Sequence, residues 1–142
     1  MRAGFSGTRD GMTLRQIHVL GLLLTDYADD DPVFTHGDCQ GADEEAHALA
    51  ICRGYQVLVQ PCDMSWMRAG CEGLVVLPPL PPLKRNHNIV DFAELMFVCP
   101  KQREERRRSG TWATWRYARK LHRPTILIYP NGGFVEQDLH RI

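Results

Sequence analysis

Five short runs of apolar residues alternate with longer stretches in which apolar residues recur every three or four positions. The short runs are rich in β-branched and aromatic side chains, and the last three end at a proline, as strands often do. Alternation of short apolar runs with helical patterns predicts a mostly parallel α/β sheet with helices on both faces. We expect strands at residues 2–5, 32–36, 55–61, 94–100 and 124–130.

The helical stretches have recognisable starts and ends. Thr13 suits an N-cap, and a helix from there to about Ala28 would place Leu14 and Leu22 on its apolar face. A second helix follows the loop "GDCQGAD", carries acidic residues in its first turn, where the helix dipole favours them, and stops at Gly54. A short third helix in "RNHNIVDFAEL" would turn its apolar side chains inward, namely Ile89, Val90 and Phe92.

The proline-rich segment 77–86, "LPPLPPLKRN", lies between the third and fourth strands. Proline lacks an amide hydrogen and restricts the residue before it, so we expect a polyproline-like connector rather than regular helix. The alternative is a ligand for an SH3-type domain. It is disfavoured because the segment lies inside the predicted domain.

Composition and charge narrow the class of protein. The chain has 142 residues, 44% hydrophobic and 24% charged, which suits one domain over residues 1–142. Its 17 basic residues balance 17 acidic ones, which weighs against a nucleic-acid partner. Five cysteines without a C-x-x-C pair disfavour disulfides and structural zinc and favour a reducing cytoplasm. No apolar run is long enough to cross a membrane.

Three loops of unusual composition are expected at one edge of the sheet, because the carboxyl ends of parallel strands meet there and ligands bind where the strand order reverses. Glycines allow close approach of backbone amides, and hydroxyls and helix N-termini suit phosphate oxygens. The alternative is that these loops are only turns and helix caps. The candidate ligand-binding residues in them are Ser6, Gly7, Thr8, Arg9, Gly37, Asp38, Gly41, Asp43, Arg108, Ser109, Gly110 and Thr111.

Other chemical groups in the chain give weaker signals. His36 and His47 match no zinc-site spacing, so we expect a pair at a helix surface and no metal. Trp112 and Trp115, one helical turn apart, are expected in the core or at a subunit interface, with base stacking as the alternative. The run "KQREERRR" is expected to be solvated except for its last residue, Arg108.

Four segments in order, "GFSGTRDGMT", "HGDCQGADEEAH", "RNHNIVDFAELMFVCP" and "RSGTWATWRYARKLHRP", resemble the SLOG superfamily. This Rossmann-like group includes the LOG phosphoribohydrolases and DprA, and the chain is most similar to its YspA-like branch. The resemblance implies a Rossmann-like three-layer sandwich with a mostly parallel five-stranded sheet, a nucleotide or nucleotide-derived ligand, no cofactor, and a homo-oligomer. It also adds Arg85 and Asn86, the "RN" stretch that recurs in that branch, to the ligand-binding residues.

The resemblance is weaker for activity. LOG enzymes cleave the N-glycosidic bond of nucleoside monophosphates with a P-G-G-x-G-T-x-x-E motif. Gly110 and Thr111 match its G-T, but Thr114 replaces the glutamate, and a hydroxyl cannot act as that carboxylate does. The leading hypothesis is therefore a nucleotide-binding protein that senses or sequesters its ligand. The alternatives are a nucleotide N-glycosidase with Asp38 or Asp43 as catalytic carboxylate and, third, a DprA-like single-strand DNA binder.

Overall fold

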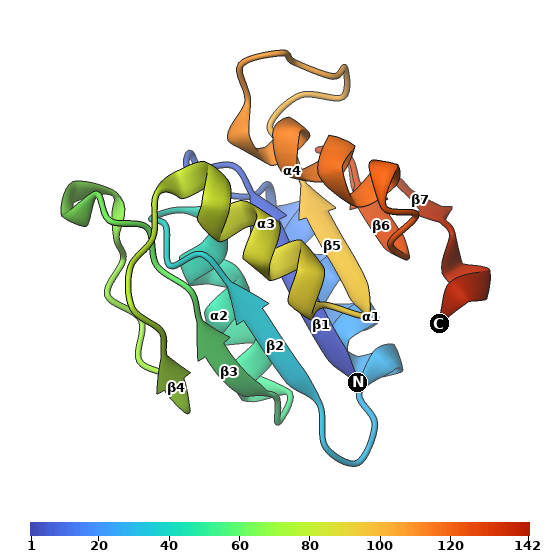
Figure 1. The fold of residues 1–142 in the computed structure, drawn as a ribbon. Helices are drawn as coiled ribbons and strands as arrows, with labels where there is room; N and C mark the ends of the chain where they lie inside the picture. Colours follow the sequence, from blue (N-terminus) through green and yellow to red (C-terminus); the bar gives the residue numbers. More distant parts are fainter.

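The computed structural model describes all 142 residues and has a seven-stranded sheet at its centre (Figure 1). The strands are β1 Arg2–Gly7, β2 Val33–His36, β3 Gln56–Val59, β4 Val75–Val76, β5 Leu95–Cys99, β6 Thr125–Ile128 and β7 Phe134–Gln137. Their order is β4-β3-β2-β1-β5-β6-β7, and every pair is parallel except β6 with β7. The predicted α/β fold is confirmed.

The prediction of five strands is wrong, because the sheet has seven and is mixed. β4 is only two residues long, too short to produce a pattern of alternation. β7 pairs antiparallel with β6, with Gln137 opposite Thr125, and its residues are mostly exposed, so they carry no core signal. Both missed strands lie at the sheet edges and leave the central arrangement of β2, β1 and β5 as expected.

Four helices cover the sheet, two on each face (Figure 1). They are α1 Leu14–Tyr27, α2 Ala42–Cys52, α3 Pro82–Phe92 and α4 Gly110–Lys120. α1 packs beside α2 on one face, and α3 packs beside α4 on the other. The result is the expected three-layer arrangement. None of the helices has the length and apolar character that crossing a membrane requires.

α1 buries a different face from the one predicted. Leu14 is 85% exposed and Leu22 is 53% exposed, whereas Leu20, Leu23 and Leu24 are buried in the main apolar cluster. Leu23 and Leu24 lie three and four positions after Leu20, so the three side chains share one face of the helix.

The N-terminus of α1 also fixes the strand ends beneath it. Thr13 and Gln16 form a reciprocal capping box, as the predicted N-cap requires. The buried Gln16 side chain then donates from Nε2 to the carbonyls of Pro100, at 2.9 Å, and Ile128, at 3.0 Å. Because these carbonyls end β5 and β6, one glutamine holds both strand ends in place.

α3 begins earlier than predicted, inside the proline-rich segment. Pro82 is its first residue, a position where the missing amide hydrogen costs nothing because no acceptor is available. The polyproline prediction is therefore wrong from Pro82 onward. Ile89 and Val90 are buried as predicted, whereas Phe92 is only half-buried beneath the Arg2 guanidinium.

The order of the strands reverses at β1. The chain builds β2, β3 and β4 on one side of β1, then returns to place β5, β6 and β7 on the other. At such a point the loops after neighbouring strands diverge, which leaves a crevice at the carboxyl edge of the sheet.

Candidate functional site

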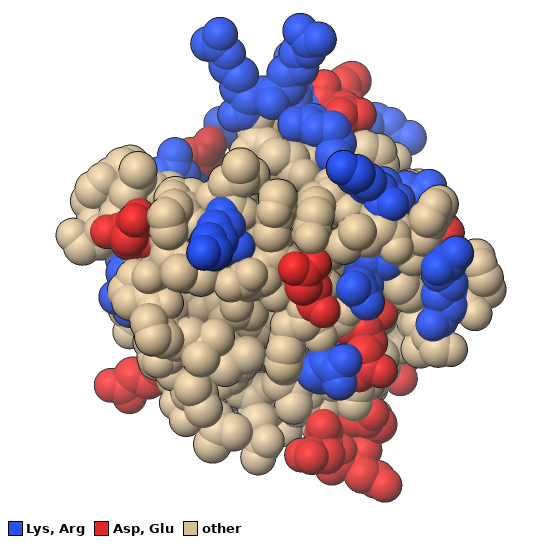
Figure 2. All heavy atoms as spheres, viewed as in Figure 1, with Lys and Arg blue, Asp and Glu red and all other residues tan.

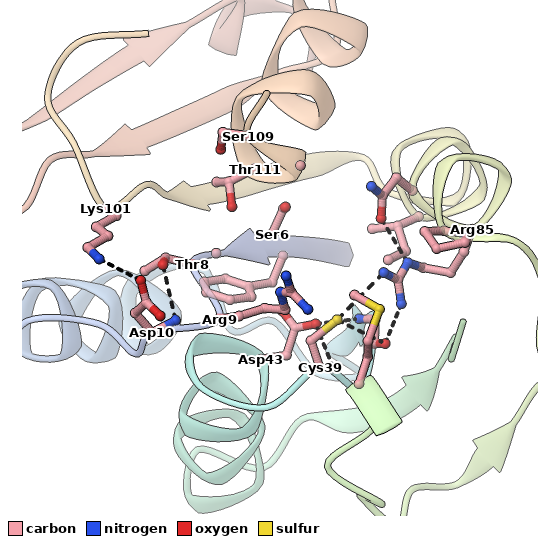
Figure 3. Close-up of a pocket in the computed structure, with 18 of the residues that line it drawn as sticks. Ser6, Thr8, Arg9, Asp10, Cys39, Asp43, Arg85, Lys101, Ser109 and Thr111 are labelled. Carbon is pink, nitrogen blue, oxygen red and sulfur yellow. Dashed lines mark hydrogen bonds and ion pairs between the residues drawn. The ribbon is translucent and has the colours of Figure 1, made fainter. Parts of the chain in front are cut away.

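One pocket opens at this crevice, at the carboxyl ends of β1, β2 and β5 (Figure 3). Its volume is about 490 Å³, which lies within the roughly 300–1,000 Å³ usual for small-molecule sites. The three loops chosen from the sequence line it together, and the N-terminal half of α3 closes one side.

Most residues predicted to bind ligand line this pocket. Two do not: Asp38 and Gly41. Gly41 caps α2 at a φ of 85°, and a Cβ there would collide with the backbone carbonyl of Arg9, so the fold itself requires this glycine. The predicted residues in the lining are Ser6, Gly7, Thr8, Arg9, Gly37, Asp43, Arg85, Asn86, Arg108, Ser109, Gly110 and Thr111.

The N-terminus of α4 presents hydrogen-bond donors to the pocket. Ser109 is the N-cap, and its Oγ accepts from the Trp112 amide at 3.2 Å. The amides of Gly110 and Thr111 lie in the first turn and have no acceptor within the helix. The Thr111 and Ser6 hydroxyls face each other across the pocket (Figure 3). Free amides at the positive end of a helix dipole favour an anion.

Gly110 is not explained by the fold. Its φ is not positive, and a Cβ built on it would meet no atom within 4 Å. Neither backbone conformation nor packing therefore demands glycine. Gly110 is exposed and lines the pocket, so a side chain at this position would reduce the open space at the N-terminus of α4.

Thr114, which stands where the LOG glutamate would be, is turned away from the pocket. It is 2% exposed, and its hydroxyl donates to the Gly110 carbonyl at 2.9 Å. Its hydroxyl proton is therefore committed to the first turn of α4. The pocket has no carboxylate from this helix.

Positive charge dominates the pocket. Lys101 is neutralised by Asp10, at 2.6 Å between Nζ and Oδ2, but the arginines in the lining form no ion pair. Figure 2 shows basic side chains gathered at the top of the molecule, where Figure 1 places the loop from β5 to α4. The basic residues in the lining are Arg9, Arg85, Lys101, Arg106 and Arg108, and the acidic ones are Asp10 and Asp43.

Arg85 is a buried guanidinium without a carboxylate partner. It is 5% exposed, and Nε donates to Asn86 Oδ1 at 2.7 Å. Its Nη1 donates to the Gly37 carbonyl, and Nη2 lies 3.6 Å from the Cys39 sulfur (Figure 3). The amide oxygen and the carbonyl are neutral groups. The Cys39 thiol is neutral too, because burial raises its pKa to about 11. Arg85 therefore carries a positive charge in the pocket wall that none of its hydrogen-bond partners neutralises, and the pocket carboxyl group that interacts with this charge is Asp43.

Asp43 is the buried carboxyl group of the pocket. It is 5% exposed, and one oxygen, Oδ2, accepts from the amides of Gly37, at 3.2 Å, and Cys39, at 3.1 Å. Burial raises the pKa of Asp43 to about 6, although those amides and the Arg85 charge act in the opposite direction. The pocket thus contains a carboxyl group that titrates near neutral pH.

Asp38 lies five residues before Asp43, in the loop that leads into α2, but serves a different purpose. Its side chain is fully buried and accepts from the Cys71 amide at 2.7 Å and from Arg68 Nε at 3.1 Å. Burial alone would raise the pKa of Asp38, but these bonds and the Arg68 charge hold it below its ordinary value. Both oxygens are occupied outside the pocket.

His36 and His47 do not form the expected pair at a helix surface. His36 is fully buried at the end of β2, and its Nε2 lies 2.9 Å from His47 Nδ1. These two nitrogens and the Cys71 sulfur lie within 4.8 Å of one another, as metal ligands can. However, His36 Nδ1 accepts from the Asp38 amide at 2.9 Å. The proton of the neutral ring is therefore on Nε2, which cannot then coordinate a metal.

The two tryptophans of α4 lie outside the pocket. Trp112 is 2% exposed in the apolar cluster between α3, α4 and the sheet, which confirms its expected place in the core. Trp115 is half-buried against the same cluster and donates from Nε1 to Gln137 Oε1 at 3.0 Å. Neither ring faces the site.

Several residues of the pocket were missed in the sequence. Lys101, Gln102 and Arg106 belong to the charged run assigned to solvent, where their distance from Ser109 along the chain hid their proximity. Met67 comes from the connection between β3 and β4, which has no glycine-rich loop as a signal. The remaining missed residues are Phe5, Asp10, Cys39, Pro82 and Ile89.

No protein-family model matches the chain, and no curated protein matches it either. Among solved structures, the molybdenum cofactor binding protein from the phototrophic bacterium Rippkaea orientalis is similar over 90% of this chain and 76% of its own, with a TM-score of 0.68 and 18% identity. DNA processing protein A (DprA) from Helicobacter pylori, which binds single-stranded DNA, is similar over 89% of this chain and 64% of its own, with a TM-score of 0.63 and 18% identity.

The similarity to these two structures supports the Rossmann-like arrangement of an α/β sheet covered by helices. At 18% identity the similarity shows the fold alone and assigns no ligand. Membership of the SLOG superfamily, and of its YspA-like branch, stays a prediction.

Proposed function

We propose that the protein binds a nucleotide or a nucleotide-derived phosphorylated small molecule in the pocket between β1, β5 and α4, in order to sense or sequester it. The observation that carries this proposal is Gly110. It begins α4 with free amides, has no structural need to be glycine, and leaves open space beside these amides in the pocket, where a phosphate group could bind.

The charges of the pocket support an anionic ligand. A buried guanidinium without an ion pair is costly, and all the hydrogen-bond partners of Arg85 within the protein are neutral. Arg9, Arg106 and Arg108 are likewise free of carboxylates. A phosphate ester would satisfy these donors together with the Ser109 and Thr111 hydroxyls.

The proposal is tested by substituting Gly110 with valine. Because no atom lies within 4 Å of the added Cβ, Gly110→Val should fold normally while its side chain occupies the phosphate position. Ala113→Val, on the same helix but outside the pocket, is the matched control. Calorimetric titration with AMP, GMP, CMP and UMP should show binding to wild type and Ala113→Val and none to Gly110→Val. Equal binding by all three proteins, or no binding to wild type, would refute the proposal.

A second candidate function is hydrolysis of the N-glycosidic bond of the same ligands. It is favoured by Asp43, a carboxyl group in the pocket with a pKa raised to about 6. Such a group can stabilise positive charge developing on the sugar or activate water near neutral pH. Release of free base from the four nucleoside monophosphates by wild type, with loss in Asp43→Asn, would establish it.

A further inference from the structure

The two ends of the pocket differ in chemistry. On one side of β1, α4 and the loop before it contribute amides, hydroxyls and arginines. On the other side, the connection from β3 to β4 contributes Met67, from a short 3₁₀ turn at Ser65–Met67, beside Pro82 at the start of α3. In Figure 1 this connection lies at the left of the molecule, away from α4. One end therefore suits a phosphate, and the other suits an apolar, flat group.

Trp66 precedes Met67 in this connection and does not itself line the pocket. It is 68% exposed, which is unusual for a ring of this size unless the ring has a partner. The Arg9 guanidinium lies 5.6 Å from the centre of the indole ring, within the range of a cation–π contact. Arg9 itself lines the pocket, so Trp66 supports a pocket residue from behind.

The segment that carries Trp66 is held firmly to the pocket loop. The Gln40 amide donates to the Met67 carbonyl at 3.1 Å, and the Ala69 amide donates to the Asp38 carbonyl at 2.7 Å. The Arg68 side chain is fixed by its ion pair with Asp38. Trp66 is therefore presented on fixed backbone, and a platform that is already ordered loses little entropy when a ligand binds.

We propose that Arg9 and Trp66 form a platform on which the base of the ligand stacks: the base lies against the planar guanidinium of Arg9, and Trp66 holds that plane in position. This inference rests on the proposed function, since it assumes a phosphorylated ligand anchored at α4. It assigns the ligand class as one with an aromatic base, and purines should bind more tightly than pyrimidines because they offer a larger stacking surface.

The test separates the base from the phosphate by using two probes, AMP and ribose 5-phosphate. Trp66→Ala and Arg9→Lys should each weaken AMP binding by about tenfold, the usual worth of one stacked base. Neither should change the affinity for ribose 5-phosphate by more than about twofold, because lysine keeps the charge but not the plane. Trp66→Phe should retain most of the AMP affinity.

Met64→Ala is the matched control, since Met64 lies on the same connection, is 43% exposed and is outside the pocket. If wild type binds AMP and ribose 5-phosphate equally and Trp66→Ala changes neither, the platform is refuted while the phosphate site stands. If Arg9→Lys weakens both probes alike, Arg9 acts only as a charge, and the platform is again refuted. If wild type binds neither probe, both proposals fail.

Discussion

The Asp38 carboxylate, fully buried, accepts a hydrogen bond from Arg68 Nε at 3.1 Å and so joins the loop after β2 to the connection between β3 and β4. The Cys71 amide reaches the other oxygen of the same carboxylate at 2.7 Å. This single side chain therefore positions the segment that carries Trp66 and the pocket residue Met67. Its effect on ligand binding would be indirect.

Asp38→Asn should destabilise the protein by roughly 1–3 kcal/mol at neutral pH, because asparagine has one acceptor oxygen and either the Cys71 amide or Arg68 Nε then loses its acceptor. Since the folded protein holds the pKa of Asp38 below its ordinary value, the stabilisation is present above about pH 4 and is lost as the pH falls below it. Urea unfolding of both proteins at about pH 7 and about pH 3 checks this, and the difference should shrink in acid. Equal stability at neutral pH would contradict it.

Arg108→Ala should weaken AMP binding by about tenfold, the worth of one charge-assisted contact to phosphate. Arg107→Ala is the control, because Arg107 precedes it in the same basic run but does not line the pocket. Calorimetric titration at low and physiological salt distinguishes a direct contact from a general field, since a field would be screened equally for both variants. An equal loss of AMP affinity in both variants would show that the basic run acts only through long-range attraction of the anionic ligand.

The centre of the fold could be predicted because β1, β2, β3, β5 and β6 are apolar runs buried between two layers of helices. Burial leaves a pattern in the sequence. The edge strands β4 and β7 have largely exposed residues, and their hydrogen bonds to a neighbouring strand leave no such pattern. The error at Leu14 has a different cause. A leucine near a helix end is compatible with more than one apolar face, and Leu14 turns out to be exposed.

The loops that form the site could be predicted from the sequence, but the directions in which their side chains point could not. Asp38 lies in the loop after β2 and Asp43 in the first turn of α2, and their spacing gives no sign of which carboxylate faces the pocket. Positive φ angles at Asp38, 58°, and Gly41, 85°, turn the backbone between them, so that Asp43 reaches the pocket and Asp38 faces the opposite way. The contact between Trp66 and Arg9 could not be predicted, because the two residues are 57 positions apart in the sequence.

His36 should make the protein sensitive to mild acid. Burial, together with His47, lowers its pKa to about 3, whereas in the unfolded chain it takes up a proton near 6.5. Acid therefore favours the unfolded state as soon as the pH falls below about 6.5. His36→Gln should be less stable throughout, but its stability should change less between about pH 7 and about pH 5. His140→Gln, at an exposed position, should match wild type, and identical slopes for all three would contradict the prediction.

The titration of Asp43 should change the stability of the folded protein in the opposite direction to that of His36, over the acidic part of the same pH range. The folded protein holds the proton up to about pH 6, whereas the unfolded chain releases it at the ordinary value of 3.8. Between these values the folded state binds the proton more tightly, so stability falls as the pH rises, and the full cost is present above about pH 6. Linkage sets that cost at about 2–3 kcal/mol. A carboxyl group kept at such a cost points to a use in the pocket.

Asp43→Asn should therefore be more stable than wild type by about 1–3 kcal/mol at pH near 8, because the amide oxygen still accepts from the Gly37 and Cys39 amides and no charge is buried. The advantage should disappear near pH 4, where wild type is itself neutral. Urea unfolding at the two pH values measures this. The same variant, incubated with AMP, separates the two functions: retained binding with base release abolished would make Asp43 catalytic, whereas an Asp43→Asn protein less stable than wild type at high pH would show that the carboxylate is needed for the fold.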